Sequence, residues 1–298
     1  MHRRDPTVPM PASCSFDQLL ARCGLPRLEA RALMSLASGR PREWLIAHGP
    51  DLVEPALRER FEALVLRRHE GEPIAYLAGV REFHGHRFEV GPAVLIPRPE
   101  TEQLVDLVID QASPGAWVLD LGTGSGAIAV SVARARPDLH MTATDRSPES
   151  LAVARRNAQT LLGEAQASRI AWHEGDWWSA LPAGAAFDVI VSNPPYIAQA
   201  DPHLAQGDLR FEPHGALAAG ADGLADLRTL VAGAPQYLRP GGLLAVEHGW
   251  DQGAAVRGLM RAAGFVAPAT LRDAQQHERI TLGRIQANVG RSAVPGLE

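Results

Sequence analysis

The chain has 298 residues, 46% of them hydrophobic and 5% aromatic, with a formal net charge of −5. This length predicts about two domains, each able to bury an ordinary core, and the acidic balance argues against a broad basic surface for nucleic acid. The two cysteines form no CxxC pattern and the histidines no HExxH pattern, so we expect no metal site and no disulfide framework.

Targeting signals also bear on the class of protein. No apolar run approaches the length of a membrane span, and the first residues lack the apolar core of a signal peptide. Cysteines this sparse fit a reducing compartment. We therefore expect a soluble, cytoplasmic protein that makes no contact with a membrane.

The first quarter of the chain has a helical pattern. Residues 1–13 are rich in proline and arginine, which predicts a disordered tail. From Ser15 to Leu77, apolar residues recur at helical spacing and are interrupted by glycine and proline. We therefore predict a domain of four or five helices within residues 1–80.

A change of period marks the end of the helical segment. Polar and apolar residues alternate over 82–96 on either side of Gly91-Pro92, which predicts a β-hairpin with its turn at that dipeptide. This hairpin is the expected linker, residues 81–98. A helix over about 100–110 should follow it.

From Ala116 onward, strands and helices alternate. Ser147 and Pro148 have the residue types of an N-cap and a first helical position. Alternation of this kind predicts an α/β domain over residues 99–286, with a largely parallel sheet covered on both faces, and a tail over 287–298. The predicted strands are 117–121, 141–145, 170–174, 189–193, 243–248, 265–270 and 279–285, and the main helices are 127–135, 148–162, 223–238 and 254–263.

A glycine-rich loop follows the first predicted strand of this domain and opens directly into a helix. Its residues are Gly122, Thr123, Gly124, Ser125 and Gly126. Glycines there let a ligand lie against the backbone at a helix N-terminus. Asp145, at the end of the next strand, can accept hydrogen bonds from both hydroxyls of a ribose. Loop and acid together predict a cofactor that contains adenosine.

The spacing of the glycines bears on which cofactor binds. The dinucleotide fingerprint is G-x-G-x-x-G, whereas this loop reads G-x-G-x-G. That register fits S-adenosylmethionine (SAM), which has no pyrophosphate, better than NAD. Trp177 follows the third strand and is a candidate to stack on the adenine, although it could equally cap the core. For the adjacent Trp178 we favour the core, and Asp176 could reach the adenine amino group.

The segment Asn193-Pro194-Pro195-Tyr196 ends the fourth strand of the domain. Neither proline can donate a ladder hydrogen bond, and each restricts the residue before it to extended backbone. The resulting corner carries an amide side chain, free carbonyls and an aromatic ring, which suits a planar NH2 group. It predicts chemistry on an amide or amino nitrogen, with a simple proline-rich turn as the alternative.

Together these segments resemble the class I SAM-dependent methyltransferases, and within them the N5-glutamine methyltransferases of peptide-chain release factors (the HemK/PrmC family). The resemblance implies a Rossmann-like, mostly parallel seven-stranded sheet and an N-terminal helical bundle that recognises the substrate. It extends from residue 71 to 253. The matching segments are GEPIAYLAGVREFHGHRFEV, VLIPRPETEQLVD, VLDLGTGSGAIAVSVA, FDVIVSNPPYIAQAD, LRFEPHGALAAGADGL and LLAVEHGWDQG.

The resemblance also implies an activity. It is methyl transfer from SAM to the side-chain amide nitrogen of the glutamine in the GGQ motif of release factors 1 and 2. By similarity, Gly122–Gly126, Asp145, Trp177 and Asn193 bind SAM, and Asn193–Tyr196 hold the glutamine. We expect Asn193 Oδ1 and the Pro194 carbonyl to accept the two N–H protons while Tyr196 stacks on the amide. Because the sulfonium methyl is already activated, positioning should dominate and no strong base is needed.

Other interpretations stay open. Methylation of a glutamine of ribosomal protein L3 is one, and methylation of adenine N6 in DNA or RNA, which uses similar corners, is another. A SAM-binding scaffold without transfer is a third. The connection over 198–222 is longer than a simple loop and could order over the site. Weaker site candidates are Asp120, Pro97–Glu102, Arg210, Glu212, Pro213 and Glu247, the last expected to be a structural acceptor.

Overall fold

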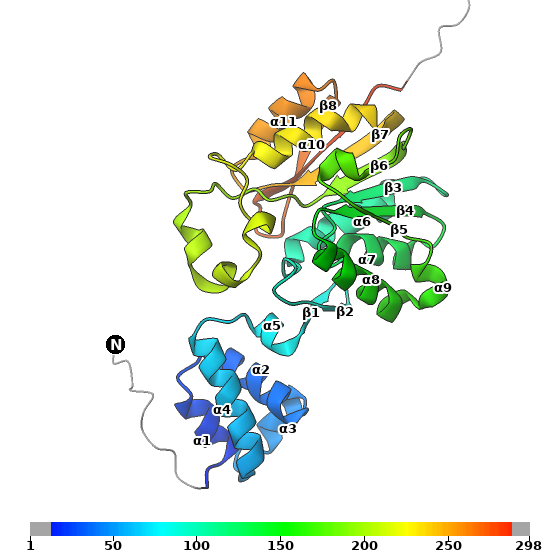
Figure 1. Cartoon of the computed structure of the whole chain (residues 1–298). Coiled ribbons are helices and arrows are strands. Elements are labelled where there is room, and N and C mark those ends of the chain that lie inside the picture. The colour runs from blue at the N-terminus through cyan, green and yellow to red at the C-terminus, as the bar shows by residue number, and fades with distance from the viewer. Residues whose placement is uncertain (1–12, 288–298) are drawn as a thin grey trace, which may run out of the picture. The chain divides into compact units, whose positions relative to one another are not determined.

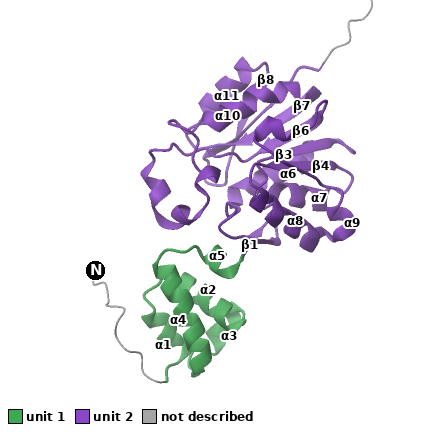
Figure 2. Cartoon of the chain, viewed as in Figure 1, with its two compact units in different colours: residues 1–79 green, residues 80–298 purple. Residues whose placement is uncertain are grey.

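The computed structural model describes residues 13–287, and the chain divides into two compact units, 1–79 and 80–298 (Figure 1 and Figure 2). The predicted tails over 1–13 and 287–298 fall outside the described residues, apart from residues 13 and 287. Within the described range, no helix is both long and apolar enough to cross a membrane.

Unit 1 is helical, as the apolar spacing predicts. A capping box begins its first helix: Ser15 Oγ accepts from the Gln18 N–H, and Gln18 Oε1 accepts from the Ser15 N–H. The core packs around Phe16, Met34 and Phe61. The helices are α1 (Phe16–Arg22), α2 (Arg27–Ser38), α3 (Arg42–Ala47), α4 (Pro55–His69) and α5 (Ile74–Ala78).

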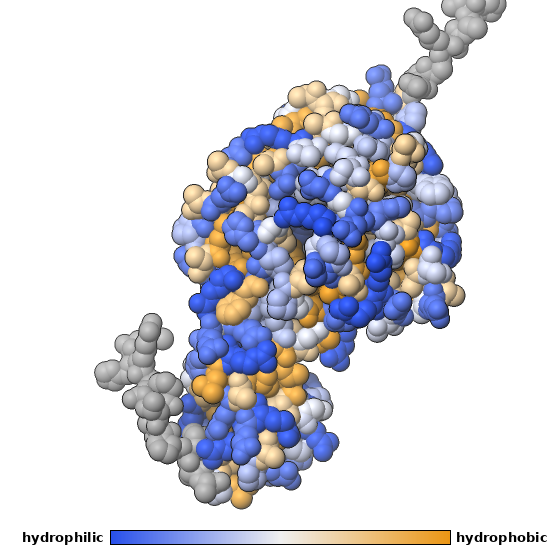
Figure 3. Space-filling model, viewed as in Figure 1, coloured by the Kyte–Doolittle hydropathy of each residue, from blue (hydrophilic) through white to orange (hydrophobic). Residues whose placement is uncertain are grey.

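Several large apolar side chains of unit 1 face solvent. Leu28, Ile46, Leu52 and Leu66 are each more than half exposed, at 66%, 54%, 69% and 64%. Figure 3 shows apolar residues reaching the visible surface of this unit among charged ones. Scattered exposed apolar residues of this kind are ordinary on folded proteins.

The hairpin is present, but the prediction of its turn was wrong. Strands β1 (Val80–Phe83) and β2 (His86–Glu89) pair antiparallel and turn at His84 and Gly85, whose φ angles are 49° and 72°. Two consecutive positive φ angles define the two-residue turn that suits the twist of a hairpin. Residues 91–96 form no strand, because the Val94 N–H turns back to the Gly91 carbonyl and the Ile96 N–H donates to a carboxylate.

A seven-stranded sheet forms the centre of unit 2, in the order β5-β4-β3-β6-β7-β9-β8. The first five strands are parallel, and β9 runs antiparallel to both β7 and β8. The predicted mostly parallel α/β sheet is therefore confirmed. Its strands are β3 (Trp117–Leu121), β4 (His140–Asp145), β5 (Ala171–Glu174), β6 (Phe187–Ser192), β7 (Leu238–Glu247), β8 (Val266–Arg272) and β9 (Glu278–Arg284).

Helices cover both faces of this sheet (Figure 1). One face packs against α6 (Glu102–Gln111), α7 (Ala127–Ala135) and α8 (Pro148–Leu162), with the short α9 (Glu164–Ala167) after it. The other packs against α10 (Ala225–Gly233) and α11 (Gly253–Ala262). Ser147 caps α8 as predicted, its Oγ accepting from the Ser150 N–H at 3.0 Å. Both sheet faces are thereby buried, which leaves the strand ends for a ligand.

Asn157 of α8 ties the hairpin to the glycine loop. Its Oδ1 accepts from the Glu89 N–H at 2.7 Å, and its Nδ2 donates to the carbonyls of Glu89 and Ser125 at 3.0 and 2.9 Å. The residue is 2% exposed, and its bond to the Ser125 carbonyl is buried, so water replaces that bond poorly if the side chain is lost.

We therefore expect Asn157→Ala to lower the free energy of unfolding by about 2–3 kcal/mol, because it removes the partner of the buried Ser125 carbonyl and two further bonds to the half-buried backbone of Glu89. Chemical denaturation measures the change. Gln159→Ala, at an exposed position of the same helix, is the control and should cost less than about 0.5 kcal/mol. Equal losses in the two variants would contradict the structural role of Asn157.

Candidate active site

A cavity of about 260 Å³ lies at the carboxyl ends of β3, β4 and β6. Of the residues predicted to bind the cofactor, all but Gly126 line it. Pro195 of the corner also lines it, whereas Pro194 and Tyr196 are not among its lining residues. The cofactor-site residues on its wall are Gly122, Thr123, Gly124, Ser125, Asp145, Trp177 and Asn193.

The glycine loop is held down by the neighbouring strand. The N–H groups of Gly122 and Thr123 both donate to the Thr144 carbonyl at 2.9 Å. Gly122 has φ 73°, and a Cβ added there would lie 3.1 Å from the Trp177 ring. Gly126, behind the wall, has φ 80°, and a Cβ on it would lie 3.1 Å from the Cβ of Ala154. Glycine thus permits both the turn and two close contacts.

Asp145 holds the loop as well as facing the cavity. Its Oδ2 accepts from the Gly124 N–H and its Oδ1 from the Ser147 N–H, both at 2.9 Å. Burial raises the pKa of this carboxyl, and the two N–H donors oppose that shift. Each oxygen keeps a lone pair, so the carboxylate can still accept from two hydroxyl groups of a ligand. Its link to the loop was missed, since only the ribose role was inferred from the sequence.

The two tryptophans after β5 have different surroundings. Trp177 lines the cavity with φ 45°, and its Nε1–H donates to Asp226 Oδ1 of α10 at 3.1 Å. Trp178 donates to the Thr229 carbonyl and stacks on Tyr237 with ring centres 4.9 Å apart. Trp178 therefore packs with the α10 face, as favoured from the sequence. The role of Asp226 had no signal in the sequence.

Asp120 lies beneath the glycine loop and is fully buried. Its Oδ2 accepts from the Thr123 hydroxyl at 2.7 Å and from the Ala129 N–H at 3.2 Å. Its Oδ1 has no hydrogen-bond partner among the described residues. Burial is the main cause that raises the pKa of this carboxyl to about 7.

Asn193 stands at the corner after β6, on the cavity wall. Its Nδ2 donates to Thr101 Oγ1 at 3.0 Å. Its Oδ1 is buried, and the described part of the chain offers it no hydrogen-bond donor. An unpaired buried carbonyl oxygen costs free energy unless a ligand supplies the donor, so this atom marks a place for an N–H group.

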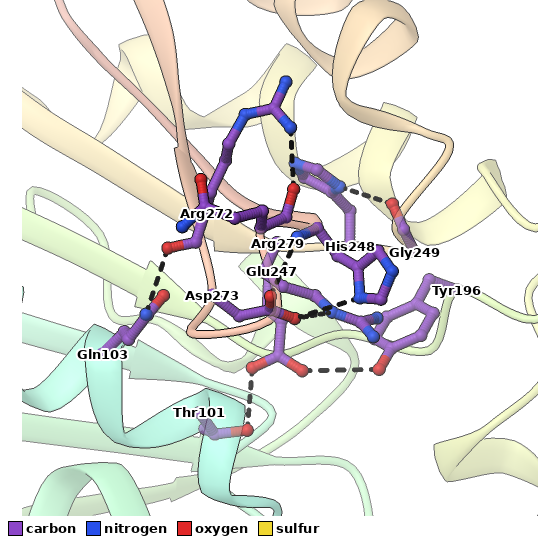
Figure 4. Close-up of polar contacts among 11 residues, drawn as sticks. Thr101, Gln103, Tyr196, Glu247, His248, Gly249, Arg272, Asp273 and Arg279 are labelled. Carbon is purple, nitrogen blue, oxygen red and sulfur yellow. Dashed lines mark hydrogen bonds and ion pairs between the residues drawn. The ribbon is translucent and has the colours of Figure 1, made fainter.

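Glu247, at the end of β7, joins the corner to the segment before α6 (Figure 4). One carboxylate oxygen accepts from the Thr101 hydroxyl at 2.7 Å and the other from the Tyr196 hydroxyl at 3.4 Å. Burial raises the pKa of Glu247 to about 7 and also raises that of Tyr196. Glu247 is thus an acceptor within the structure. Stacking of Tyr196 on a substrate stays a prediction.

The long connection after β6 forms part of the cavity wall. It contains the 3-10 turns η3 (Pro202–Ala205), η4 (Gly207–Phe211) and η5 (His214–Ala216). The buried Glu212 accepts from the Ile96 N–H at 2.9 Å and pairs with the Arg98 guanidinium. Arg146 donates to the Gly215 carbonyl at 3.0 Å. Pro213, Gly215 and Ala216 line the cavity, so the connection closes one side of it.

Comparison with known proteins gives matches over both units. The PrmC N-terminal domain matches residues 15–79, and the methyltransferase small domain matches residues 100–209. A solved 16S rRNA N2 G1207 methyltransferase of T. thermophilus, in complex with AdoMet and guanosine, aligns with a TM-score of 0.52 at 20% identity. The alignment covers 70% of this chain and 50% of the rRNA methyltransferase chain. This likeness shows the fold.

Curated relatives are much more similar in sequence. The release factor glutamine methyltransferase of Bordetella pertussis is 54% identical over 267 residues, which are 89% of this chain and 97% of that protein. The release factor glutamine methyltransferase of Burkholderia pseudomallei is 52% identical over 284 residues, 94% of this chain and 98% of that protein. At this identity and coverage, the chain belongs to the family of release factor glutamine methyltransferases.

Proposed function

We propose that this enzyme transfers a methyl group from SAM to the side-chain amide nitrogen of the glutamine in the GGQ motif of release factors 1 and 2. The observation that supports it most directly is Asn193 Oδ1, a buried acceptor without a partner in the described chain, on a residue that lines the cavity. The names of the relatives, release factor glutamine methyltransferase, identify the class of substrate.

The cavity fits SAM by the chemistry of its walls. Asp145 offers carboxylate oxygens to a ribose diol, Trp177 offers an aromatic face, and Gly122–Ser125 let a ligand approach the backbone. Asp120 is buried beneath the loop and not on the cavity wall, so it supports the site by accepting from the Thr123 hydroxyl at 2.7 Å rather than by contact with the ligand. We propose that these wall residues, together with Gly126 behind the loop and Asn193, hold the cofactor.

SAM, when bound, supplies a methyl group already activated by its sulfonium, so the protein need only prepare the nucleophile. A primary amide nitrogen is a poor nucleophile because its lone pair is conjugated with the carbonyl. Asn193 Oδ1 and the Pro194 carbonyl accept its two protons, which holds the nitrogen in line and favours the positive charge that develops on it. With SAM bound, its methyl group would pass to this nitrogen as its C–S bond breaks, and the alkylated nitrogen would give its proton to water.

We further propose that unit 1 contributes to binding the release factor. Its exposed Leu28, Ile46, Leu52 and Leu66 provide apolar area of the kind found in protein interfaces. The net charge of −5 supports recognition of a protein rather than direct binding of nucleic acid. Because release factors act on the ribosome, the expected compartment is the cytoplasm.

The assignment is tested with labelled SAM and purified release factor, the label being mapped by mass spectrometry. We expect methylation of the GGQ glutamine and none when that glutamine is replaced by alanine. Ribosomal protein L3, DNA and RNA are incubated in parallel. Label on any of these in preference to the release factor would contradict the proposed substrate.

Asn193→Ala should lower kcat by about a hundredfold or more, because it removes an acceptor aligned with developing charge. The affinity for the release factor, measured by titration, should change by less than about threefold, since the protein interface extends well beyond one side chain. Turnover at the wild-type rate in this variant would rule out the proposed role of Asn193.

Gly122→Ala should weaken SAM binding by about tenfold. The added Cβ would lie 3.1 Å from the Trp177 ring, which is too close, so the ring must move from its position on the cavity wall. Gly115→Ala is the matched control. Its φ of 72° is almost the same as the 73° of Gly122, but a Cβ there meets nothing within 4 Å. Calorimetric titration with SAM should show the loss in the first variant alone.

A further inference from the structure

A chain of hydrogen bonds runs from the cavity wall to a buried carboxylate. Asn193 Nδ2–H donates to Thr101 Oγ1 at 3.0 Å, and the Thr101 hydroxyl donates to Glu247 Oε2 at 2.7 Å. Figure 4 shows Glu247 reaching both Thr101 and Tyr196. Thr101 is 4% exposed and Glu247 is 1% exposed, so solvent does not compete for these bonds.

The carboxylate of Glu247 determines the direction of both hydrogen bonds in this series. An ionised carboxylate can only accept, so the Thr101 proton must point to Glu247. The Thr101 oxygen then has only lone pairs left for Asn193, so it accepts a hydrogen bond from the Asn193 side chain. Of the two ends of the Asn193 amide, only the NH2 end can donate, and therefore the Oδ1 end is the one that finds no partner within residues 13–287.

The two ends of a carboxamide have almost the same shape, so packing alone selects neither orientation. The reversed orientation would present two N–H donors to a substrate NH2 group that also carries only donors on its nitrogen. Such a pair cannot hydrogen-bond, and the nitrogen would be left unoriented. The orientation of the Asn193 amide therefore decides whether this corner can hold its substrate.

We propose that Thr101 and Glu247 are positioning residues, which fix the Asn193 carboxamide with Oδ1 toward the substrate amide. The proposal rests on the proposed function, because it takes Asn193 Oδ1 to be the acceptor of a substrate N–H. It assigns to the PRPETE segment a task in catalysis through Asn193, beyond starting a helix.

The charge of Glu247 controls this arrangement. A protonated carboxyl can donate to Thr101, whose own proton then turns to Asn193 and favours the reversed amide. Burial raises the pKa of Glu247 to about 7, and the nearby charge of Glu100 also raises it. The Thr101 and Tyr196 hydroxyls and the guanidinium of Arg279 lower it.

Arg279 itself pairs with Asp273 at 3.0 Å, so its effect on Glu247 is partly neutralised. Glu247 is the group that must be ionised, so the positioned state is half populated near pH 7, grows as pH rises above that value and is lost as pH falls below it.

Thr101→Val keeps the shape of the side chain and removes its hydroxyl. We expect kcat to fall about tenfold to a hundredfold, because the Asn193 amide is no longer held with Oδ1 toward the substrate, while the affinity for the release factor stays within about threefold. Thr101→Ser restores the hydroxyl and should recover most of the activity. With Asn193→Ala already present, Thr101→Val should have no further effect on kcat, since its action passes through Asn193.

Three outcomes of these measurements overturn the positioning role. They are a wild-type kcat in Thr101→Val, an equal loss with and without Asn193, and no recovery in Thr101→Ser. A wild-type enzyme that leaves the release factor unmethylated overturns the proposed function instead. In that event, the positioning role is judged on the spectroscopic measurement, which needs no turnover.

That measurement follows the side-chain NH2 protons of Asn193 by ¹⁵N–¹H NMR in the unmutated protein, with the resonance assigned by its loss in Asn193→Ala. Between pH about 5 and about 9 the resonance should titrate with a midpoint near 7, as Glu247 changes charge. In Glu247→Gln the titration should disappear. A resonance that does not move with pH in the unmutated protein, or one that still titrates in Glu247→Gln, contradicts the proposal.

Discussion

The parallel pairing of β4, β3 and β6 is the constraint on which the rest of the site depends. In the register of these strands, Leu121 is level with Thr144 on one side and with Ser192 on the other. The three strands therefore end level with one another, which brings the glycine loop, Asp145 and Asn193 together at one edge of the sheet. The Thr144 carbonyl takes two N–H groups of the loop, and the Ser192 hydroxyl donates to the Leu121 carbonyl at 2.7 Å. The cavity exists because the connections from these strands diverge above that edge.

The site is built at some cost to stability. Asp120 and Glu247 are buried acids whose pKa values lie near 7, well above those of solvated carboxyls. Between the unfolded and folded pKa values the folded chain binds more protons, so their contribution to stability falls as pH rises through that window. At the site, Asp120 Oδ1 and Asn193 Oδ1 are buried and find no partner within residues 13–287, and together with the positive φ of Trp177 they add to the cost. Bound ligands that supply donors would recover part of it.

The sequence predicts features that depend on neighbouring residues, and it misses those that depend on contacts between distant parts of the chain. The helix at Ser147 follows from its cap, and β3 and α7 from periodicity. The dipeptide Gly91-Pro92 is a strong turn signal and predicts the hairpin turn there. In the structure the turn lies at His84 and Gly85 instead, which have the positive φ angles that it requires.

Long-range contacts explain the remaining gaps in the prediction. The conformation near Ile96 depends on Glu212, which lies 116 residues further along the chain. Thr101 is separated from Asn193 by 92 residues and from Glu247 by 146. No spacing rule connects residues so far apart. The residue types at the site could therefore be predicted from the motifs, but the bonds between them could not.

A buried glutamate with a pKa near 7 has the property expected of a general base, yet the geometry argues against that role for Glu247. It is 1% exposed, it is not among the residues that line the cavity, and hydroxyl groups occupy both of its oxygens. A base must reach the proton that it removes, whereas the Thr101 hydroxyl, which lines the cavity, lies between this carboxylate and the cavity. Methylation of an amide also needs no base before attack, because the alkylated nitrogen is strongly acidic. The raised pKa of Glu247 is thus better explained as the cost of burying a charged acceptor that orients the groups in front of it.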